Sequence, residues 1–139
     1  MAEKDLERLL RGMDPALSEG KYWMGTFDES QMMALANYLS GILCIFREGE
    51  GLSVVFDEGV LEELGALSEK KAEGPFALIT LNVKSDLLAV GFLARISSAL
   101  AARSIPVNAV SAYFHDHLLV PYSMKDDAMT ALGRLQAGH

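Results

Sequence analysis

The polar corner at residues 85–91 is the part of this sequence whose residue types and spacing suggest chemistry most clearly. It reads Ser85-Asp86-Leu87-Leu88-Ala89-Val90-Gly91, after an apolar run and before an amphipathic helical pattern. A backbone next to glycine can approach a small anionic ligand, and the N–H groups at a helix start attract negative charge. A second interpretation stays open, in which Ser85 or Asp86 caps the helix and Gly91 allows close helix–sheet packing.

The tripeptide His115-Asp116-His117 raises the question of a metal site. Two imidazoles two residues apart can share one side of a strand, but a tetrahedral site needs further ligands. Cys44 lies in an apolar run and His139 is terminal, so neither is a suitable partner. We therefore predict a solvated hairpin tip and no metal. A pH-sensitive contact between protomers is an alternative, because histidine titrates near neutrality.

Acidic pairs are the remaining candidates for catalysis. Paired carboxylates do acid/base work when burial or proximity separates their pKa values. The three pairs in this chain fall on predicted helix surfaces or in a turn: Glu48 with Glu50, Glu62 with Glu63, and Asp126 with Asp127. Ser97-Ser98 has no partner arrangement that suggests a nucleophile. The sequence predicts no catalytic residue, and hence a binding protein rather than an enzyme.

Composition narrows the range of partners. With 12 Lys and Arg against 19 Asp and Glu, the 139-residue chain has a net charge of −7. This charge disfavours nucleic acid and anionic membranes, both of which attract basic surfaces. No apolar run is long enough to span a bilayer, and the charged start contains no signal-peptide core. The single cysteine, Cys44, excludes an internal disulfide and favours the cytoplasm.

Periodicity predicts alternating helices and strands. The first half has a helix at 5–13 that ends before Pro15, a strand at 21–27, a weak helix within 28–40, a hairpin of 42–47 with 52–56, and a helix after Asp57. Residues 68–75 resemble a linker. The second half has a strand at 76–83, a helix at about 88–103, strands at 107–114 and 118–120, and a last helix after Ser123. Short stretches of similar sequence about 68 residues apart favour an internal duplication.

The order strand, helix, strand, strand, helix is that of a ferredoxin-like unit. The amino-acid sequence of residues 76–83, 85–94 and 105–113 further resembles an ACT domain of the aspartate-kinase type. Together with the His115-Asp116-His117 hairpin, it is similar to small stand-alone bacterial ACT proteins of unassigned function. The match covers roughly residues 76–135, and the earlier half resembles a degenerate ACT-like unit.

The resemblance implies an α+β fold, with two ferredoxin-like βαββαβ ACT units in tandem, antiparallel sheets and helices on one face. We expect residues 1–70 to form the degenerate unit with an N-terminal helix, and 71–139 to form the ACT domain. No strand follows the last helix, so a strand from the first half must complete the second sheet. Residues 21–27 are the suggested strand.

The resemblance also implies a function, which is non-catalytic sensing of a small molecule, most simply an amino acid bound between ACT units of a homodimer. Helix N–H groups would hold the ligand carboxylate, and Asp86 or the Asn108 amide would meet the ammonium. The expected binding residues are Ser85, Asp86, Leu87, Val90, Gly91, Phe92 and Asn108. No cofactor is expected. The alternative is a structural or interaction module of the same fold without a ligand. A lined concavity at the Asp86 corner separates the two hypotheses.

Overall fold

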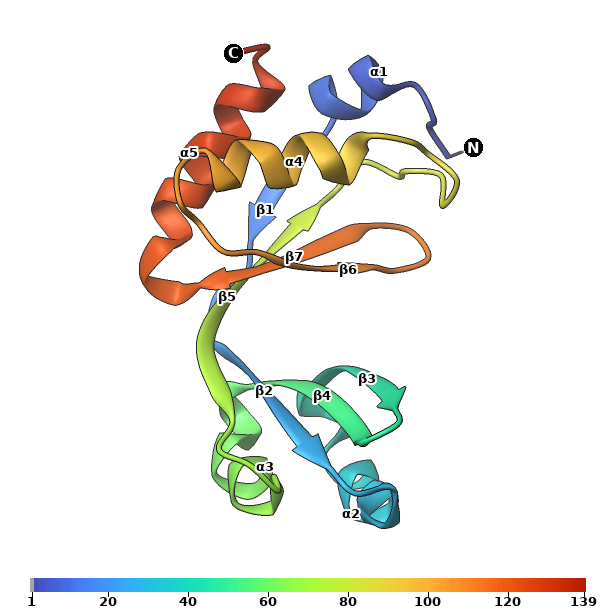
Figure 1. The fold of residues 1–139 in the computed structure, drawn as a ribbon, viewed down its shortest axis with the longest axis vertical. Helices are drawn as coiled ribbons and strands as arrows, with labels where there is room; N and C mark the ends of the chain where they lie inside the picture. Colours follow the sequence, from blue (N-terminus) through green and yellow to red (C-terminus); the bar gives the residue numbers. More distant parts are fainter. Residues whose placement is uncertain (1) are drawn as a thin grey trace. The chain divides into compact units, whose positions relative to one another are not determined.

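The computed structural model describes residues 2–139, which divide into two compact units (Figure 1). Gly20–Phe76 form one, here called the central unit. The residues up to Glu19 join Ala77–His139 in the other, here called the terminal unit. The chain therefore leaves the terminal unit, builds the central unit and returns.

The central unit is a βαββαβ unit. Its elements are β2 (Tyr22–Phe27), α2 (Met32–Ala36), β3 (Ile42–Glu48), β4 (Gly51–Asp57), α3 (Leu61–Leu67) and the start of β5 (Glu73–Leu81). Single 3-10 turns precede α2, β3 and α3, at Glu29–Gln31, Leu39–Gly41 and Glu58–Val60. The strand order is β3-β4-β2-β5 and every pairing is antiparallel. This is the ferredoxin-like order.

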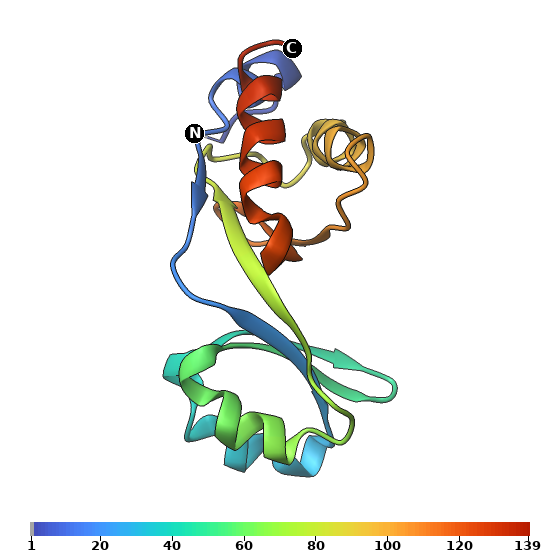
Figure 2. The same ribbon diagram turned by 90° about the vertical axis from the view of Figure 1, so that its left-hand side faces the viewer.

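Strand alternation explains which face of the central sheet is covered. Leu52, Val54 and Phe56 alternate along β4 and are buried together, because every second side chain of a strand points to the same face. Phe27, Leu35 of α2 and Leu64 of α3 complete this core. Figure 2 shows α2 and α3 on one face of the sheet, in cyan to green.

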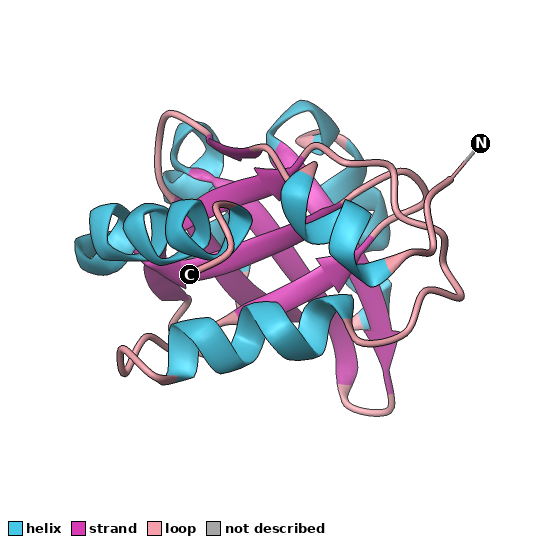
Figure 3. Ribbon diagram, turned by 90° about the horizontal axis from the view of Figure 1, so that it is seen from above, coloured by secondary structure: helices cyan, strands magenta, loops and turns pink. Residues whose placement is uncertain are grey.

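The terminal unit has the same spatial arrangement of strands and helices, but its strands come from both ends of the chain. Its elements are α1 (Leu6–Arg11), β1 (Pro15–Leu17), the later part of β5, α4 (Phe92–Ala101), β6 (Asn108–Ser111), β7 (Asp116–Pro121), a 3-10 turn at Tyr122–Met124 and α5 (Lys125–Gln136). The strand order is β1-β5-β7-β6. Helices α4 and α5 lie on one face of this sheet, and α1 packs with them (Figures 1 and 3).

The fourth strand of the terminal unit is β1. It pairs antiparallel with β5, placing Pro15 opposite Leu81 and Leu17 opposite Ile79. The suggested strand, residues 21–27, is instead the first strand of the central unit, where Tyr22 pairs with Asp57. The reason is that the turn at Asp14 (φ 47°) lets three extended residues follow α1 directly. A three-residue strand leaves too little periodicity to be seen in the sequence.

Two predicted boundaries move. The predicted linker at 68–75 contains the start of β5, because Glu73 already pairs with Met24 of β2. Helix α4 begins at Phe92 instead of about residue 88. Gly91 has φ 94°, in the left-handed region, and a helix cannot continue through that conformation.

Both units share the spatial order of their four strands and have helices on one face, and the terminal unit takes its fourth strand, β1, from before β5 in the chain. The predicted α+β tandem architecture is confirmed. The two helix-covered cores are separate clusters, one built on β4 and one on β5 and β7.

Candidate ligand-binding site

The corner between β5 and α4 leaves a helix start without a side-chain cap. Residues 82–91, here called the corner loop, connect the two elements, and Gly91 occupies the N-cap position. The first intrahelical bond of α4 runs from the Arg95 N–H to the Gly91 carbonyl at 3.0 Å. The N–H groups of residues 92–94 therefore lie ahead of the helical hydrogen-bond ladder, as in any helix start. They are the donors that an anionic group at this corner would meet.

Gly91 is required by its backbone conformation rather than by close packing. A Cβ atom built on it would lie 3.5 Å from Leu6 Cδ2, an ordinary van der Waals distance. The sheet does not limit this position. What disfavours other residues is φ 94°, which side chains with a Cβ adopt at a cost.

Neither polar residue of the corner caps α4. The Asp86 carboxylate accepts the Leu88 N–H at 2.8 Å and shapes the turn before the helix. The Ser85 hydroxyl donates to Asp116 Oδ2 at 3.0 Å, across to the first residue of β7. The capping interpretation of this corner is therefore wrong, and Ser85 instead connects the loop to a carboxylate on the sheet.

Asp116 is a buried carboxylate, with 6% of its surface exposed. Ser111 is its partner across the β6–β7 ladder, and the Ser111 hydroxyl donates to Asp116 Oδ1 at 2.6 Å. Two serine hydroxyls therefore hold the two oxygens of this carboxylate. The prediction of a solvated hairpin tip is wrong for Asp116, because β7 begins at this residue and turns it toward the corner.

The flanking histidines lie beside Thr80 of β5 and beside each other. Thr80 Oγ1 lies 2.9 Å from His117 Nδ1, and the His115 and His117 rings are 6.5 Å apart between centroids. Burial first, and His115 second, lower the pKa of His117 below its usual 6.5, while Asp116 opposes them. Among residues 2–139 the structure shows no cluster of three or more metal-ligating side chains.

The corner residues enclose a cavity of about 150 Å³, here called the corner cavity. It lies entirely within the terminal unit. Its walls come from the corner loop, the first turn of α4, and the facing ends of β6 and β7: Ser85, Asp86, Leu87, Ala89, Gly91, Phe92, Leu93, Ala94, Ser111 and Asp116. None of these ten side chains is cationic. The corner is thus a lined concavity, the feature that separates the two functional hypotheses.

Five of the seven residues proposed from the sequence line the cavity: Ser85, Asp86, Leu87, Gly91 and Phe92. Val90 does not, and its side chain is 85% exposed. Asn108 does not either, because it pairs with Leu119 while Ser111, three residues further along β6, reaches the cavity.

Sequence reasoning missed Ser111 and Asp116. A signal for Asp116 was present, because Asp116, Leu118 and Val120 have the two-residue spacing of one strand face. Leu118 and Val120 are buried in the core, so Asp116 shares their inward side. Ser111 carries no such signal and is found through its pairing with Asp116.

The equivalent corner of the central unit is hydrogen-bonded by its own side chains. Asp28 accepts the Ser30 N–H at 2.9 Å, and Gln31 Oε1 accepts the Asp28 N–H at 2.8 Å. Gln31 Nε2 also donates to the Leu67 carbonyl at 3.0 Å. This capping box belongs to the 3-10 turn that precedes α2, and Gln31, the N-cap of α2 itself, makes no side-chain cap bond.

Two models of known protein families match this chain. One ACT domain model matches residues 1–72 and a second ACT domain model matches residues 73–134. The chain belongs to the ACT domain family. ACT domains are regulatory rather than catalytic units, which supports a regulatory role for this tandem ACT protein.

Solved structures show the same architecture. A protein of unknown function from Vibrio cholerae, described as a possible transport protein, is 36% identical with a TM-score of 0.77, over 96% of this chain and 97% of that one. A protein from Agrobacterium tumefaciens is 17% identical with a TM-score of 0.68, covering 88% and 87%. The ligand-free regulatory subunit of aspartate kinase from Thermus thermophilus is 13% identical with a TM-score of 0.67, covering 87% and 95%. The last two likenesses concern the fold alone.

No functionally curated protein sequence matches this ACT protein. In the part of the chain that the structure describes, no helix is long and apolar enough to cross a membrane.

Proposed function

We propose that this ACT protein is a non-catalytic sensor that binds a free amino acid in the corner cavity. The observation that carries the proposal is the buried Asp116 carboxylate, which lines the same small cavity as the uncapped start of α4. An amino acid presents a carboxylate and an ammonium close together. The helix N–H groups suit the carboxylate, and Asp116 with Asp86 suits the ammonium.

The lining also bears on which amino acids fit. It contains two carboxylates, two serines and small or aliphatic side chains beside Phe92, and no Lys, Arg or His. A second carboxylate on the ligand would meet Asp116 with no cation in the lining, and the exposed Lys4 ammonium, 4.0 Å from Asp86 Oδ2, offsets Asp86 alone. Compact neutral amino acids are therefore the expected ligands, and aspartate and glutamate are expected to bind poorly.

We further propose that the protein acts as a homodimer whose second copy covers the cavity mouth. Exposed apolar side chains lie on the corner loop, which forms part of the cavity wall, and in the turn between β6 and β7: Leu87, Leu88, Val90, Tyr113 and Phe114. Ligand binding would shift the equilibrium between assembled and free states, which requires different affinities for the two. A cytoplasmic setting belongs to this proposal and is favoured by the single, half-buried cysteine, Cys44.

The same exposed residues favour one alternative, an interaction module that uses them without a ligand. Thermal unfolding of the protein with each of the twenty amino acids at millimolar concentration separates the two. A ligand at 100 times its dissociation constant adds about 2.7 kcal/mol of stability, a shift of several degrees. A shift with compact neutral amino acids supports the sensor. The absence of a shift with all twenty supports the interaction module.

A further inference from the structure

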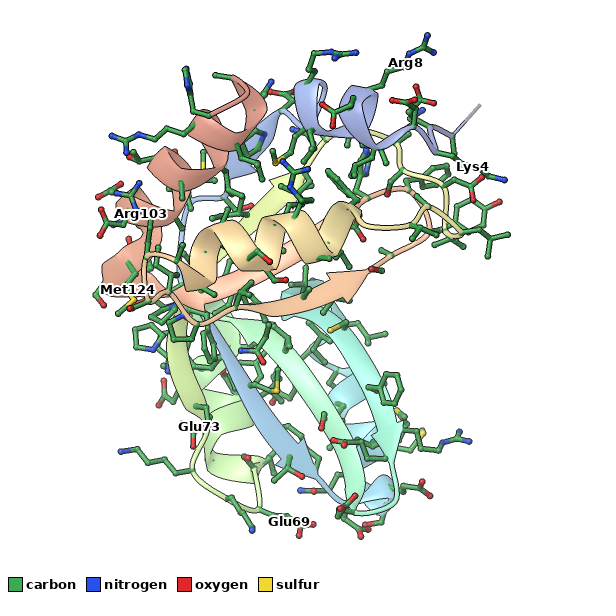
Figure 4. All side chains as sticks on the ribbon, turned by 45° about the horizontal axis from the view of Figure 1, so that its top comes forward. Lys4, Arg8, Glu69, Glu73, Arg103 and Met124 are labelled. Carbon is green, nitrogen blue, oxygen red and sulfur yellow. The ribbon has the colours of Figure 1, made fainter. Side chains whose placement is uncertain are left out.

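The N-terminal segment, residues 2–6, is hydrogen-bonded to the corner loop. Glu3 forms a parallel bridge with Ser85. The Glu3 N–H donates to the Lys84 carbonyl, and the Asp86 N–H donates to the Glu3 carbonyl, both at 2.9 Å. The Lys4 ammonium lies 4.0 Å from the Asp86 carboxylate. Figure 4 shows Lys4 beside the loop that precedes α4.

A second contact reaches the other end of the loop. Leu6 is the neighbour that a Cβ on Gly91 would meet, at 3.5 Å. The segment therefore touches the corner loop at both ends, at residues 84–86 and at Gly91. Both ends line or adjoin the corner cavity, through Ser85, Asp86 and Gly91.

In the middle of the corner loop Ala89 packs against the terminal core, and the residues around it have little support of their own. Leu87, Leu88 and Val90 are 65%, 77% and 85% exposed, so their side chains do not anchor the loop. Its internal bonds are the Leu88 N–H to Asp86 Oδ1 and the Ala89 N–H to the Asp86 carbonyl at 3.0 Å. Both depend on the placement of Asp86, which Glu3 holds.

The N-terminal segment is itself firmly anchored. Asp5 caps α1 by accepting the Arg8 N–H at 3.0 Å. Leu9 and Leu10 of α1 are buried in the terminal core, against residues of α4 and α5. A change in the corner loop is thus opposed by a segment fixed to the core of the same unit.

We propose that residues 2–6 are a latch that holds the corner loop in the conformation that forms the cavity, with Glu3 as a positioning residue. The role in binding rests on the function proposed above. A ligand that needs the ordered loop stabilises the contact between the latch and the loop. Because linkage is reciprocal, loss of the latch lowers the affinity for that ligand by the same factor.

Glu3→Pro and Glu3→Ala form a matched pair that isolates the backbone bridge. Both remove the Glu3 carboxylate and its ion pair with Arg8 at 3.6 Å. Proline additionally removes the N–H that donates to the Lys84 carbonyl. Two readouts are needed on the full chain. They are hydrogen exchange of the amides at residues 84–91 without any additive, and the thermal shift with each of the twenty amino acids.

The latch predicts that the Asp86 amide exchanges about tenfold faster in Glu3→Pro than in Glu3→Ala, the equivalent of about one net hydrogen bond. It also predicts an affinity about tenfold weaker for any amino acid that stabilises the wild type. Equal exchange in the two variants overturns the latch. Faster exchange with unchanged affinity overturns its role in binding. If no amino acid shifts the wild type but exchange is faster, the proposed sensor fails while the latch is supported.

Discussion

Asp116 is the residue on which the chemistry of the corner depends, because it brings a buried carboxylate to a cavity lined by a helix start. Its two oxygens are held by the Ser85 and Ser111 hydroxyls at 3.0 and 2.6 Å. A carboxylate fixed in this way cannot turn away from an incoming ammonium. A hydrogen bond between charged groups contributes about 1.5–3 kcal/mol, which is large enough to decide whether a small ligand binds.

Asp116→Asn is expected to weaken amino-acid binding by at least about tenfold, because the ammonium loses its charged partner. Titration calorimetry measures this loss. Asp126→Asn is the matched control, since it removes the same charge from α5, away from the cavity lining. Equal loss in both variants would mean that net charge, and not the corner, governs binding.

Gly91→Ala is expected to lower the free energy of unfolding by about 1–2 kcal/mol, the cost of a left-handed residue with a Cβ. Its φ is 94° and the Cβ itself has room, so strain and not a clash is the cause. Gly91→Asn should cost less, because asparagine tolerates this region better.

Gly133→Ala is the opposite control, measured by urea unfolding beside the two Gly91 variants. Gly133 lies inside α5, and a Cβ added there would have no neighbour within 4 Å, so alanine should add about 0.5–1 kcal/mol of stability. A Gly91→Ala protein as stable as the wild type would contradict the backbone argument.

His117 should make the fold less stable in mild acid. Burial lowers its pKa in the folded state below the usual 6.5, so the unfolded chain takes up the proton first as the pH falls. The contribution of His117 to stability is therefore complete above the unfolded pKa and is lost as the pH drops through the folded one. Urea midpoints at about pH 7.5 and about pH 5.5 should differ less in His117→Gln than in the wild type. His139→Gln, at the exposed terminus, should leave the difference unchanged.

Five of the residues that the sequence singled out line the corner cavity, but the sequence did not single out Asp116. The Gly91 corner was recognisable because a polar turn with glycine stands between a strand pattern and a helix pattern. Asp116 was hidden because it stands between two histidines in what resembles an exposed tip. Whether the residue ending a hairpin points inward depends on the exact start of the next strand, which sequence patterns fix poorly.

At the scale of elements, α1 and β1 belong with a unit whose other residues come much later in the chain, as residues up to Glu19 pack with Ala77–His139. The sequence predicted the existence of α1, because its leucines have helical spacing, but the helix ends at Arg11 with Gly12 as its C-cap, before the predicted stop at Asp14-Pro15. The sequence did not predict β1, because a strand of three residues is defined by its hydrogen-bonded pairing with β5 and not by its own sequence pattern. Pairing partners distant in sequence leave no local signal.

Leu9→Ala tests this assignment of α1. Leu9 is fully buried in the terminal core, so the substitution should cost about 2–5 kcal/mol. Hydrogen exchange should rise in residues 77–139 and stay unchanged in 20–76. Leu39→Ala, at a 57% exposed position, should change neither the free energy of unfolding nor the hydrogen exchange of residues 77–139. Faster exchange confined to residues 20–76 would contradict the assignment of α1 to the terminal unit.

At the scale of the molecule, the two ACT units have diverged at their equivalent corners. The central unit has the Asp28–Gln31 capping box on the 3-10 turn before α2, while the terminal unit has a lined cavity before α4. The fold order was predictable from periodicity and family resemblance, because both units repeat it. This difference was not predictable from periodicity, since it depends on a few side chains in the turn before each helix.

Phe114→Ser tests the proposed homodimer. Phe114 is 57% exposed in the turn between β6 and β7, and Phe46 is 70% exposed on β3 of the central unit. Sedimentation velocity should show weaker self-association for Phe114→Ser and no change for Phe46→Ser, because burial of an aromatic side chain at an interface contributes strongly to association. A protein that is monomeric at every concentration would contradict the dimer.

The most direct test of the sensor is a titration of the isotope-labelled protein with compact neutral amino acids such as alanine, serine and threonine, followed by amide chemical shifts. The account predicts saturable shifts concentrated on residues 85–94, Ser111 and Asp116, with aspartate producing little effect. Shifts that concentrate elsewhere in the chain, or equal responses to aspartate and alanine, would contradict an amino-acid site in the corner cavity.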